Sequence, residues 1–337
     1  MKKLLLPLFA VATLYSCSNT DDDTVTVDPN AKYLNGYFIT NEGNFGSGNA
    51  SISHLSADFN TVTNNIFKTA NNKDLGDVAQ SIVVNGDYAF VIVNNSNTIE
   101  VVNKKTFQSV YTITENVVSP RYAVIQNNKL YVTSLSKATV TIYDAKTYAF
   151  IKTVELNNTA ENIVATTNYI YAANNAYSGK LIEIIDTKTD TNTVDISFDH
   201  PINGLATNGQ FVYALETGNS ESKIWKLEAT TKSTSTAIAQ GNARYLVAEG
   251  TNLYYTLGRG VYKTSDALTT AGTKLFDVAE GVDSYSHLYG FNVLNGTIFT
   301  SDSKGFKDNG VVTLYKEDGT VIKELKTGMG PNGIFKF

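Results

Sequence analysis

One motif recurs seven times along this chain, and it is an aromatic-rich β run that follows a turn. It reads GYFIT (36–40), DYAFVIV (87–93), KLYVTSL (129–135), YIYAANN (169–175), FVYALET (211–217), NLYYTLG (252–258) and TIFTSDS (297–303). Aligned on the anchor aromatic residues Phe38, Phe90, Tyr131, Tyr171, Tyr213, Tyr254 and Phe299, the spacings are 52, 41, 40, 42, 41 and 45 residues. A period near forty residues with several strands in each unit is typical of propeller blades.

Each unit is predicted to hold four strands. In the third unit they fall at 121–127, 129–135, 139–145 and 150–156. The turn before the fourth strand reads YDAKT (143–147), IDTKT (185–189) and VNKKT (102–106), with looser versions at 227–231 and 316–320. Asp or Asn there can accept backbone N–H bonds within the turn. We therefore expect Asp144 and Asp186 to cap turns rather than to catalyse.

The first unit lacks its first strand, because the chain enters near Tyr33 directly in the second one. The last residues, PNGIFKF (331–337), match the first strand of the other units. We predict an all-β fold over residues 33–337: a seven-bladed β-propeller of four-stranded antiparallel blades. The C-terminal strand pairs with the N-terminal blade and removes a sheet edge. Loss of residues 331–337 should therefore open the ring.

The N-terminus predicts secretion. Lys2 and Lys3 precede an apolar run over residues 4–14, too short to span a bilayer, as in a signal peptide over residues 1–16. LYSC (14–17) resembles the lipobox of bacterial lipoproteins, which implies cleavage before Cys17 and lipidation of Cys17. Ordinary cleavage nearby is the alternative. Residues 17–32 are acidic and poorly hydrophobic, which predicts a flexible tether.

Composition limits the partners and the chemistry. The formal net charge of −5 argues against a nucleic-acid groove, which needs clustered Lys and Arg. Cys17 is the single cysteine, so no intrachain disulfide or cysteine-rich metal site can form. The glycine-rich stretch 41–51 lacks the Lys-Ser/Thr ending of a P-loop and is predicted to be a loop between strands.

No nucleophile elbow, zinc spacing or calcium loop is present in the sequence. His54 falls inside a strand and Trp225 among apolar neighbours, so we expect both to be structural. His200 and His287 precede first strands, and two histidines without a third ligand make a weak metal site. We expect no catalytic residue, no metal, no cofactor and no enzymatic activity, although a propeller lyase or lactonase remains an alternative.

The starts of the seven first strands align at one polar position. That position holds Gln80, Tyr122, Asn162, Asn203, Tyr245, Tyr289 and Asn332, and the residue before it is Arg121, Glu161 or Arg244 in three blades. These residues are predicted to ring the mouth of the channel. Loops between the second and third strands lie on the same face. Further candidates from this face are Asn44, Phe45, Asn94, Asn95, Asn174, Asn175, Tyr177, Glu216 and Arg259, with His200 and His287.

Two interpretations of this ring stay open. Amides and phenols can bond between adjacent blades and close the funnel, as in repeat proteins. Alternatively the ring and its loops bind a bulky polar ligand, since concave mouths with convergent polar groups are the usual binding sites. Tyr122 and Tyr245 each follow an arginine, and these two Arg-Tyr pairs lie three blades apart, so they could hold a ligand from both sides.

FITNEGNFGSGNASIS (38–53), SPRYAVIQNNKLYVTS (119–134) and GPNGIF (330–335) resemble the seven-bladed, YncE-like propeller lipoproteins of Gram-negative bacteria. The resemblance covers about residues 33–337. Some of those lipoproteins capture cobalamin for a TonB-dependent outer-membrane receptor, and others are linked to ferric siderophores. The resemblance therefore implies a lipid-anchored outer-membrane protein facing the cell exterior, with such a receptor as partner; the periplasmic face is the alternative.

The ring composition favours a corrinoid over a siderophore. Corrinoids display amides, which suit Asn and Tyr partners, whereas an anionic catecholate would favour the arginines and tyrosine stacking. Glu161 stands between the arginines and opposes a strongly anionic ligand. A structural or adhesive surface protein without a small ligand is a third possibility.

Overall fold

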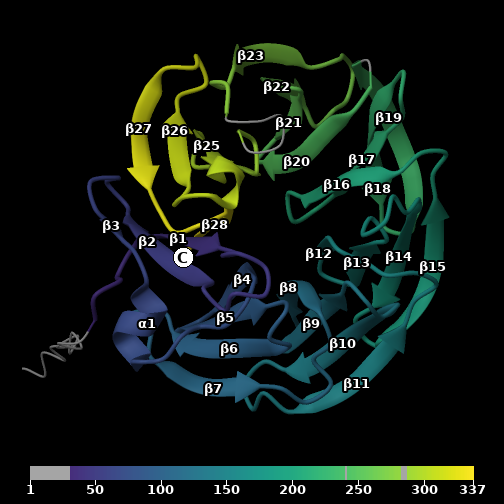
Figure 1. Ribbon diagram of the computed structural model, residues 1–337. Coiled ribbons are helices and arrows are strands. Elements are labelled where there is room, and N and C mark those ends of the chain that lie inside the picture. The colour runs from purple at the N-terminus through teal and green to yellow at the C-terminus, as the bar shows by residue number, and fades with distance from the viewer. Residues whose placement is uncertain (1–30, 240, 282–286) are drawn as a thin grey trace, which may run out of the picture.

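The computed structural model describes residues 31–239, 241–281 and 287–337, which form a ring of seven β-sheets around a central axis (Figure 1). Each sheet has four strands, and the paired strands run antiparallel. The predicted all-β, seven-bladed propeller is therefore confirmed. The proposed signal peptide, Cys17 and the tether up to residue 30 lie outside the described residues. Among the described residues, no helix is long and apolar enough to cross a membrane.

We number the blades in chain order and give their strands from the channel outward. Blade 1 comprises β28 (Pro331–Lys336), β1 (Gly36–Asn41), β2 (Ser51–Ser56) and β3 (Val62–Thr63). Blade 2 comprises β4 (Ala79–Asn85), β5 (Tyr88–Val93), β6 (Thr98–Asn103) and β7 (Ser109–Ile113). Blade 3 comprises β8 (Pro120–Gln126), β9 (Lys129–Ser134), β10 (Thr139–Asp144) and β11 (Phe150–Glu155).

The remaining blades follow the same plan. Blade 4 comprises β12 (Ile163–Ala165), β13 (Tyr169–Ala173), β14 (Leu181–Asp186) and β15 (Thr191–Ser197). Blade 5 comprises β16 (Ile202–Thr207), β17 (Val212–Thr217), β18 (Ser222–Glu228) and β19 (Thr231–Ala239). Blade 6 comprises β20 (Ala243–Glu249), β21 (Asn252–Leu257), β22 (Gly260–Ser265) and β23 (Thr273–Asp277). Blade 7 comprises β24 (Gly290–Leu294), β25 (Thr297–Asp302), β26 (Val311–Tyr315) and β27 (Val321–Lys326).

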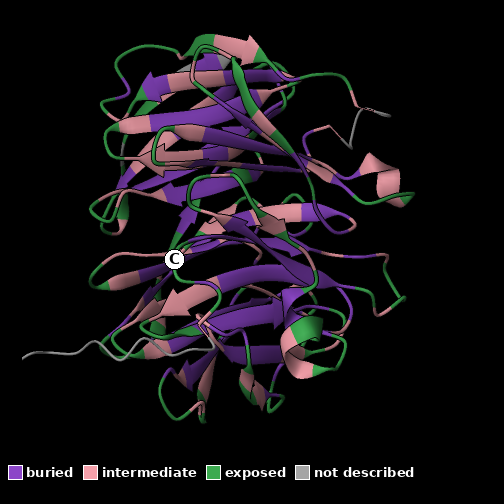
Figure 2. Ribbon diagram, turned by 90° about the vertical axis from the view of Figure 1, so that its left-hand side faces the viewer, coloured by how far each residue is buried: buried purple, intermediate pink, exposed green. Residues whose placement is uncertain are grey.

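The core lies between the blades. The second strand of a blade is buried on both faces, as in β1, where all six residues are buried. In the outer strand, exposed residues alternate with residues that are partly or fully buried, as in β15, which is the pattern of a sheet with one solvated face. In the side view of Figure 2 the strand interiors are buried, and exposed residues gather in the loops at the two faces of the ring.

The anchor aromatic residue of each repeat reaches the turn between the third and fourth strands of the next blade. Four tyrosine hydroxyls donate hydrogen bonds there: Tyr131 to Asp190 (2.7 Å), Tyr171 to the Ala229 carbonyl (2.7 Å), Tyr213 to Asp266 (3.2 Å) and Tyr254 to Glu317 (2.5 Å). The three phenylalanines contact a ring in the same turn: Phe38 with Phe107, Phe90 with Tyr148 and Phe299 with Phe59. The repeat thus marks the contact that joins consecutive blades.

The same turns are capped as the sequence predicted. Oδ1 of Asp144 accepts the backbone N–H groups of Lys146 (2.8 Å) and Thr147 (2.7 Å). Asp186 accepts the equivalent pair, from Lys188 (2.8 Å) and Thr189 (3.2 Å). These carboxylates therefore cap their turns, which is a structural role.

The C-terminal strand closes the ring as predicted. β28 pairs antiparallel with β1, with Ile334 opposite Ile39 and Phe335 opposite Phe38. The terminal Phe337 ring stacks on Phe38 at a centroid separation of 4.0 Å and an interplanar angle of 4°. Residues from the two ends of the chain therefore share one blade.

Two short helices were not predicted from the sequence. α1 (Ile66–Asn71) follows β3 and buries Ile66 and Phe67 in the core between blades 1 and 2, and η1 (Lys304–Phe306) lies in the loop after β25. Six residues are too few to establish a 3.6-residue period, so this helix leaves no pattern in the sequence.

Candidate functional site

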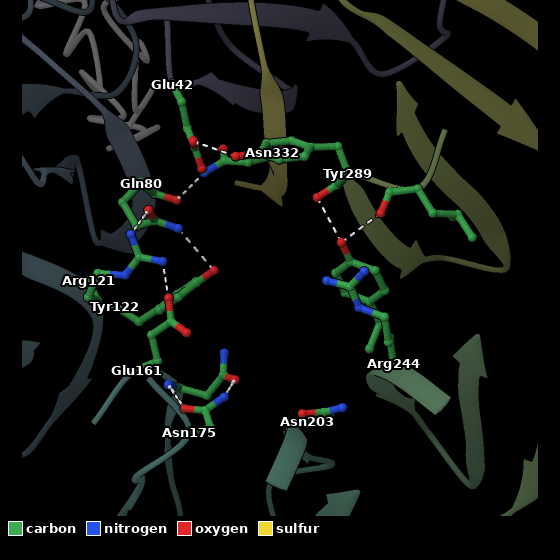
Figure 3. Close-up of a pocket in the computed structure, with 13 residues that line it drawn as sticks. Glu42, Gln80, Arg121, Tyr122, Glu161, Asn175, Asn203, Arg244, Tyr289 and Asn332 are labelled. Atoms are coloured by element: carbon green, nitrogen blue, oxygen red, sulfur yellow. Dashed lines mark hydrogen bonds and ion pairs between the residues drawn. The ribbon is translucent and has the colours of Figure 1, made fainter. Parts of the chain in front are cut away.

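The starts of the seven first strands surround a cavity of about 470 Å³ at the mouth of the channel (Figure 3). Its lining contains all seven of the aligned ring residues and the three charged residues that precede them. The lining residues are Glu42, Gln80, Arg121, Tyr122, Glu161, Asn162, Asn175, Asn203, Arg244, Tyr245, Leu288, Tyr289 and Asn332. The sequence alignment therefore located residues that meet in space, from every blade of the ring.

β-Bulges aim most of these side chains into the channel. In β4, β16, β20 and β28 the register shifts by one residue, and the extra residues are Gln80, Asn203, Tyr245 and Asn332. In β8, Arg121 and Tyr122 together occupy the place of one residue in the ladder. Bulges of this kind re-aim a side chain without disturbing the rest of the pairing. Asn162 and Tyr289 instead stand immediately before β12 and β24.

The bulge at Tyr245 carries backbone strain. Its φ of 52° lies in the left-handed region, which costs a non-glycine residue about 1–3 kcal/mol. The hydroxyl group of Tyr245 donates to the carbonyls of Leu288 and Tyr289 in the next blade, both at 2.8 Å. This contact holds the ring of Tyr245 against the wall of the cavity, beside Phe291.

Blades 7, 1 and 2 are joined by a network around Glu42. The carboxylate of Glu42 accepts a hydrogen bond from the Tyr289 hydroxyl (2.6 Å) and another from the Asn332 amide (2.8 Å). Asn332 also donates to the Gln80 carbonyl (3.1 Å). Glu42 was not predicted as a site residue, because it lies in the β1–β2 loop, outside the repeat.

Blades 2, 3 and 4 are joined by a second network around Arg121. Its guanidinium donates to the side chains of Gln80 and Glu161, and Gln80 donates to the Tyr122 hydroxyl (3.1 Å). The side chains of Arg121 and Glu161 are only 17% and 23% exposed. This pair therefore forms a recessed ion pair in the wall of the cavity rather than a surface contact.

The ring is less tightly bonded around blades 4 to 6. Asn175 donates to Asn162 within blade 4 (2.5 Å), and Asn203 makes one long hydrogen bond to the Ala243 carbonyl (3.4 Å). Among the described residues, no side-chain hydrogen bond of the ring crosses from blade 4 to blade 5. Figure 3 shows Asn203 and Arg244 facing the cavity without drawn partners. Polar groups on this side are thus available to a ligand.

Burial tunes the acids of the ring. It raises the pKa of Glu42, and the hydrogen bond from Tyr289, the nearby Arg121 charge and the hydrogen bond from Asn332 offset this only in part. Burial also raises the pKa of Tyr245 to about 12 and raises the pKa of Tyr122 and of Tyr289. These phenols stay protonated at neutral pH and act as hydrogen-bond donors.

Glu42→Gln should therefore change how stability depends on pH. Because the folded-state pKa of Glu42 is raised, this group's contribution to stability falls as pH rises from its unfolded pKa to its folded pKa. The variant lacks that loss, so its melting temperature should rise relative to the parent between acidic and neutral pH. Thermal unfolding from pH 4 to 8 measures this difference. Glu155→Gln, on the exposed end of β11, serves as the control; a difference for Glu42→Gln that stays constant with pH contradicts the prediction.

Around the ring, the described residues line three further cavities. An apolar annex of about 340 Å³ lies over blades 1 to 3 and 7 and is lined by Glu42, Gly43, Asn44, Phe45, Val78, Asn94, Arg121, Leu135, Tyr289 and Phe306. A side pocket of about 290 Å³ lies at blades 6 and 7 and is lined by Asn242, Arg244, Tyr245, Thr256, Gly258, Arg259, His287 and Leu288. Below the ring, a channel of about 370 Å³ is lined by the first strands and shares Tyr122, Asn162, Asn203, Tyr245 and Asn332 with the mouth.

The loop candidates separate into three groups. Asn175 lines the central cavity; Asn44, Phe45 and Asn94 line the apolar annex; and Arg259 and His287 line the side pocket. Tyr177 is 78% exposed, and Asn95 donates to Asp77; neither lines these cavities, and nor does His200.

Asn174 and Glu216 require a correction, because both face the inside of their blades. Asn174 is 1% exposed and donates to Glu183 (3.0 Å). Glu216 is 3% exposed and accepts hydrogen bonds from the backbone of Asp199 and His200 and from Trp225 (2.6 Å). Asn174 directly follows β13 and Glu216 lies inside β17, where hydrogen bonds hold both side chains away from the cavities of the mouth.

The histidines carry no metal-site geometry in the described residues, where no group of three or more His, Cys, Asp and Glu side chains could hold a metal ion. His54 is 7% exposed and its ring nitrogen lies 3.1 Å from the Asn35 carbonyl. It is a structural residue of β2, as expected. Trp225 in β18 is also structural and packs on Phe198.

Solved propeller structures resemble this one in fold alone. A quinonprotein alcohol dehydrogenase-like protein from Bacteroides thetaiotaomicron has a TM-score of 0.67 and 16% identity, covering 90% of this chain and 78% of its own. Hydrazine synthase from Kuenenia stuttgartiensis has a TM-score of 0.61 and 15% identity, covering 73% of this chain and 85% of its own. The computationally designed Ika8 protein has a TM-score of 0.59 and 10% identity, covering 85% and 84%.

No curated protein matches the sequence. A family does match part of it, and the matched part starts before β1 and stops between β15 and β16, at the boundary of blades 4 and 5. Residues 35–200, which form most of blade 1 and all of blades 2 to 4, match the family described as "Domain of unknown function (DUF5074)".

Proposed function

We propose that this propeller is a binding protein that takes a large polar small molecule, of the corrinoid kind, at its channel mouth. The observation that carries the proposal is the central cavity of about 470 Å³ with its lining of amides and phenols. Such a volume lies within the range of about 300–1,000 Å³ that is usual for ligand pockets. A whole corrinoid is larger, so the cavity would receive one edge of it and the apolar annex would receive more.

The charges of the mouth support a ligand that is close to neutral. Two arginines, Arg121 and Arg244, line the central cavity. Glu161 and Glu42 supply two carboxylates, of which only Glu161 was predicted from the sequence. Arg121 is already paired with Glu161. Amide groups at the edge of a corrinoid could exchange hydrogen bonds with Asn162, Asn203 and the phenols, which donate and accept in the same way.

Binding is favoured over catalysis by the way the acids are held. Glu42 is engaged by Tyr289 and Asn332, and Glu161 by Arg121. A general acid or base must reach the substrate proton, whereas each of these carboxylates is already bonded to ring residues that fix its orientation. Glu42 and Glu161 therefore stabilise the ring, and Asn203 and its neighbours bind the ligand.

The place and partner follow from the sequence resemblance and belong to the same proposal. We take Cys17 as a lipid anchor at the outer membrane, with the propeller facing the cell exterior and a TonB-dependent receptor as the protein that accepts the ligand. Incorporation of labelled palmitate, lost in Cys17→Ala, tests the anchor. Labelling in intact cells that is equal for both proteins contradicts it.

Calorimetric titration of the protein with cyanocobalamin and with ferric enterobactin tests the ligand. We expect heat with cyanocobalamin, and an affinity about two- to tenfold lower in Asn203→Leu, because one hydrogen bond contributes about 0.5–1.5 kcal/mol. Gln210→Leu is the matched control, since Gln210 is an exposed amide at the other end of blade 5. Heat with ferric enterobactin alone would favour siderophore capture, and heat with neither would overturn the uptake function in favour of a structural or adhesive role.

A further inference from the structure

All arginines of this chain lie at the channel mouth. Of the 27 basic residues, three are arginines, Arg121, Arg244 and Arg259, and the others are lysines. Arg121 and Arg244 line the central cavity, and Arg244 and Arg259 line the side pocket. A guanidinium presents a planar set of donors that matches a carboxylate or a phosphate, which an ammonium does not. The remainder of the surface carries lysine, so arginine is confined to the one region where ligand geometry would matter.

The three guanidiniums differ in how far they are satisfied. Arg121 is bonded to Gln80 and Glu161. Arg259 donates to the Val278 carbonyl (3.2 Å) and lies 3.5 Å from Glu280, whose side chain is 81% exposed. Arg244 makes no side-chain hydrogen bond or ion pair with any residue that the structure describes, and its guanidinium lies 5.8 Å from the ring of its neighbour Tyr245. Toward the described residues, all N–H donors of the Arg244 guanidinium are therefore free.

The side pocket joins Arg244 to Arg259. Asn242 and Thr256 add polar groups to its wall, and within residues 31–239, 241–281 and 287–337 no Asp or Glu lines it. The exposed Glu280 can exchange with another anion at little cost, because surface ion pairs contribute only about 0–1 kcal/mol. Among the residues that the structure describes, the lining of the side pocket thus carries two guanidiniums and no carboxylate, whereas Glu42 and Glu161 line the central cavity from other blades.

The side pocket opens onto the central cavity. Arg244, Tyr245 and Leu288 line both spaces, and Figure 3 shows Arg244 at the edge of the mouth opposite Arg121. A ligand held in the central cavity could therefore extend a substituent past Tyr245 into the side pocket.

We propose that the side pocket is an anion-binding subsite, in which Arg244 and Arg259 bind a carboxylate or phosphate group of the ligand. The identity of the rest of that ligand rests on the proposed function. The anion-binding subsite itself is inferred from the arginines alone. The pocket of about 290 Å³ has room for the acidic group and a short linker. A ligand of the otherwise neutral mouth should therefore carry one negatively charged group at the edge that enters the side pocket.

Arginine modification tests the subsite without any corrinoid. Phenylglyoxal reacts with guanidinium groups, and peptide mass spectrometry can follow all three arginines in one digest. Arg244 should react faster than Arg121, and inorganic phosphate or benzoate should slow its modification about threefold or more, with ionic strength held constant by sodium chloride. Benzamide, the neutral counterpart of benzoate, should not. Protection by phosphate alone or benzoate alone identifies the preferred acidic group, and protection by neither overturns the subsite.

The pairing of the two arginines has its own test. In Arg259→Gln the protection of Arg244 by the same anion should weaken severalfold, because the second guanidinium is gone. Full protection in this variant would overturn a two-arginine subsite.

Two corrinoids separate the subsite from the proposed function. Cobalamin carries a phosphodiester, and cobinamide has the same ring system without that phosphodiester and its nucleotide. In Arg244→Gln the affinity ratio of cobalamin to cobinamide should fall about tenfold to hundredfold, as expected for a lost charge-assisted hydrogen-bond pair, and in Gln210→Leu it should not change. An unchanged ratio in Arg244→Gln with both corrinoids bound overturns the subsite alone. Anion protection of Arg244 with neither corrinoid bound overturns the proposed function alone.

Discussion

Removal of residues 331–337 should leave a chain that no longer unfolds cooperatively. The deletion takes away the whole inner strand of blade 1 and exposes the ladder edge of β1, whose six residues are buried. It also uncovers Phe38, which stacks on Phe337, and Ile39, which faces Ile334. An unpaired buried edge is costly because its backbone groups lose their partners and invite pairing with other chains.

The expected loss in the free energy of unfolding is comparable to the total stability of a typical domain. Ile334 is fully buried and contributes about 1.5–3 kcal/mol by burial, with part of that value from each of Phe335 and Phe337. The lost strand pairing adds to this, and domains are stable by only about 5–15 kcal/mol. Urea denaturation followed by circular dichroism should show a broad, early transition. The transition of Phe337→Ala should lie between those of the deletion and the parent, and Lys336→Ala, exposed on the same strand, should match the parent. If the deletion unfolds as sharply as the parent, β28 does not close the ring.

Tyr131→Ala should destabilise the protein by about 3–5 kcal/mol, as other buried aromatic truncations do. Tyr131 is 0% exposed and sits between blades 3 and 4. Its hydroxyl donates to Asp190, which Lys129 also contacts at 2.5 Å. The substitution therefore opens a cavity between two blades and removes one of the contacts that defines their spacing.

Tyr131→Phe separates the ring from the hydroxyl. It keeps the packing and leaves Asp190 its contact with Lys129, so we expect a loss of about 1 kcal/mol. The free energies of unfolding from urea titrations of the two variants measure both terms. Equal effects of the two substitutions would contradict a role for packing at this anchor.

The sequence predicted the fold well because the repeat reports a physical contact. Each anchor aromatic packs on the next blade, so Tyr131 and its equivalents recur with the spacing of the blades. The ring at the mouth was located for the same reason. Gln80 and Asn203 occupy equivalent bulges, and equivalent positions in a closed ring face the same axis.

The rest of the site lies in loops, where no repeat operates. Glu42 follows β1 and reaches the channel only because of the path of its loop, and its partners come from β28 and from the residue before β24. Asn174 and Glu216 illustrate the opposite error. Both were predicted to lie in loops after the second strands. Glu216 instead lies inside β17, and both side chains are buried, because strand ends and side-chain burial cannot be read from composition.

The bulges at the strand starts separate the chemistry of the mouth from the folding of the blades. An inserted residue such as Gln80 or Asn203 stands outside the ladder register, so its replacement leaves the strand pairing in place. One scaffold can therefore present different sets of side chains around the same axis. A combinatorial library restricted to Gln80, Asn203 and Asn332 could alter ligand preference while the strand pairing within each blade is kept, which makes this propeller a candidate for redesign as a receptor.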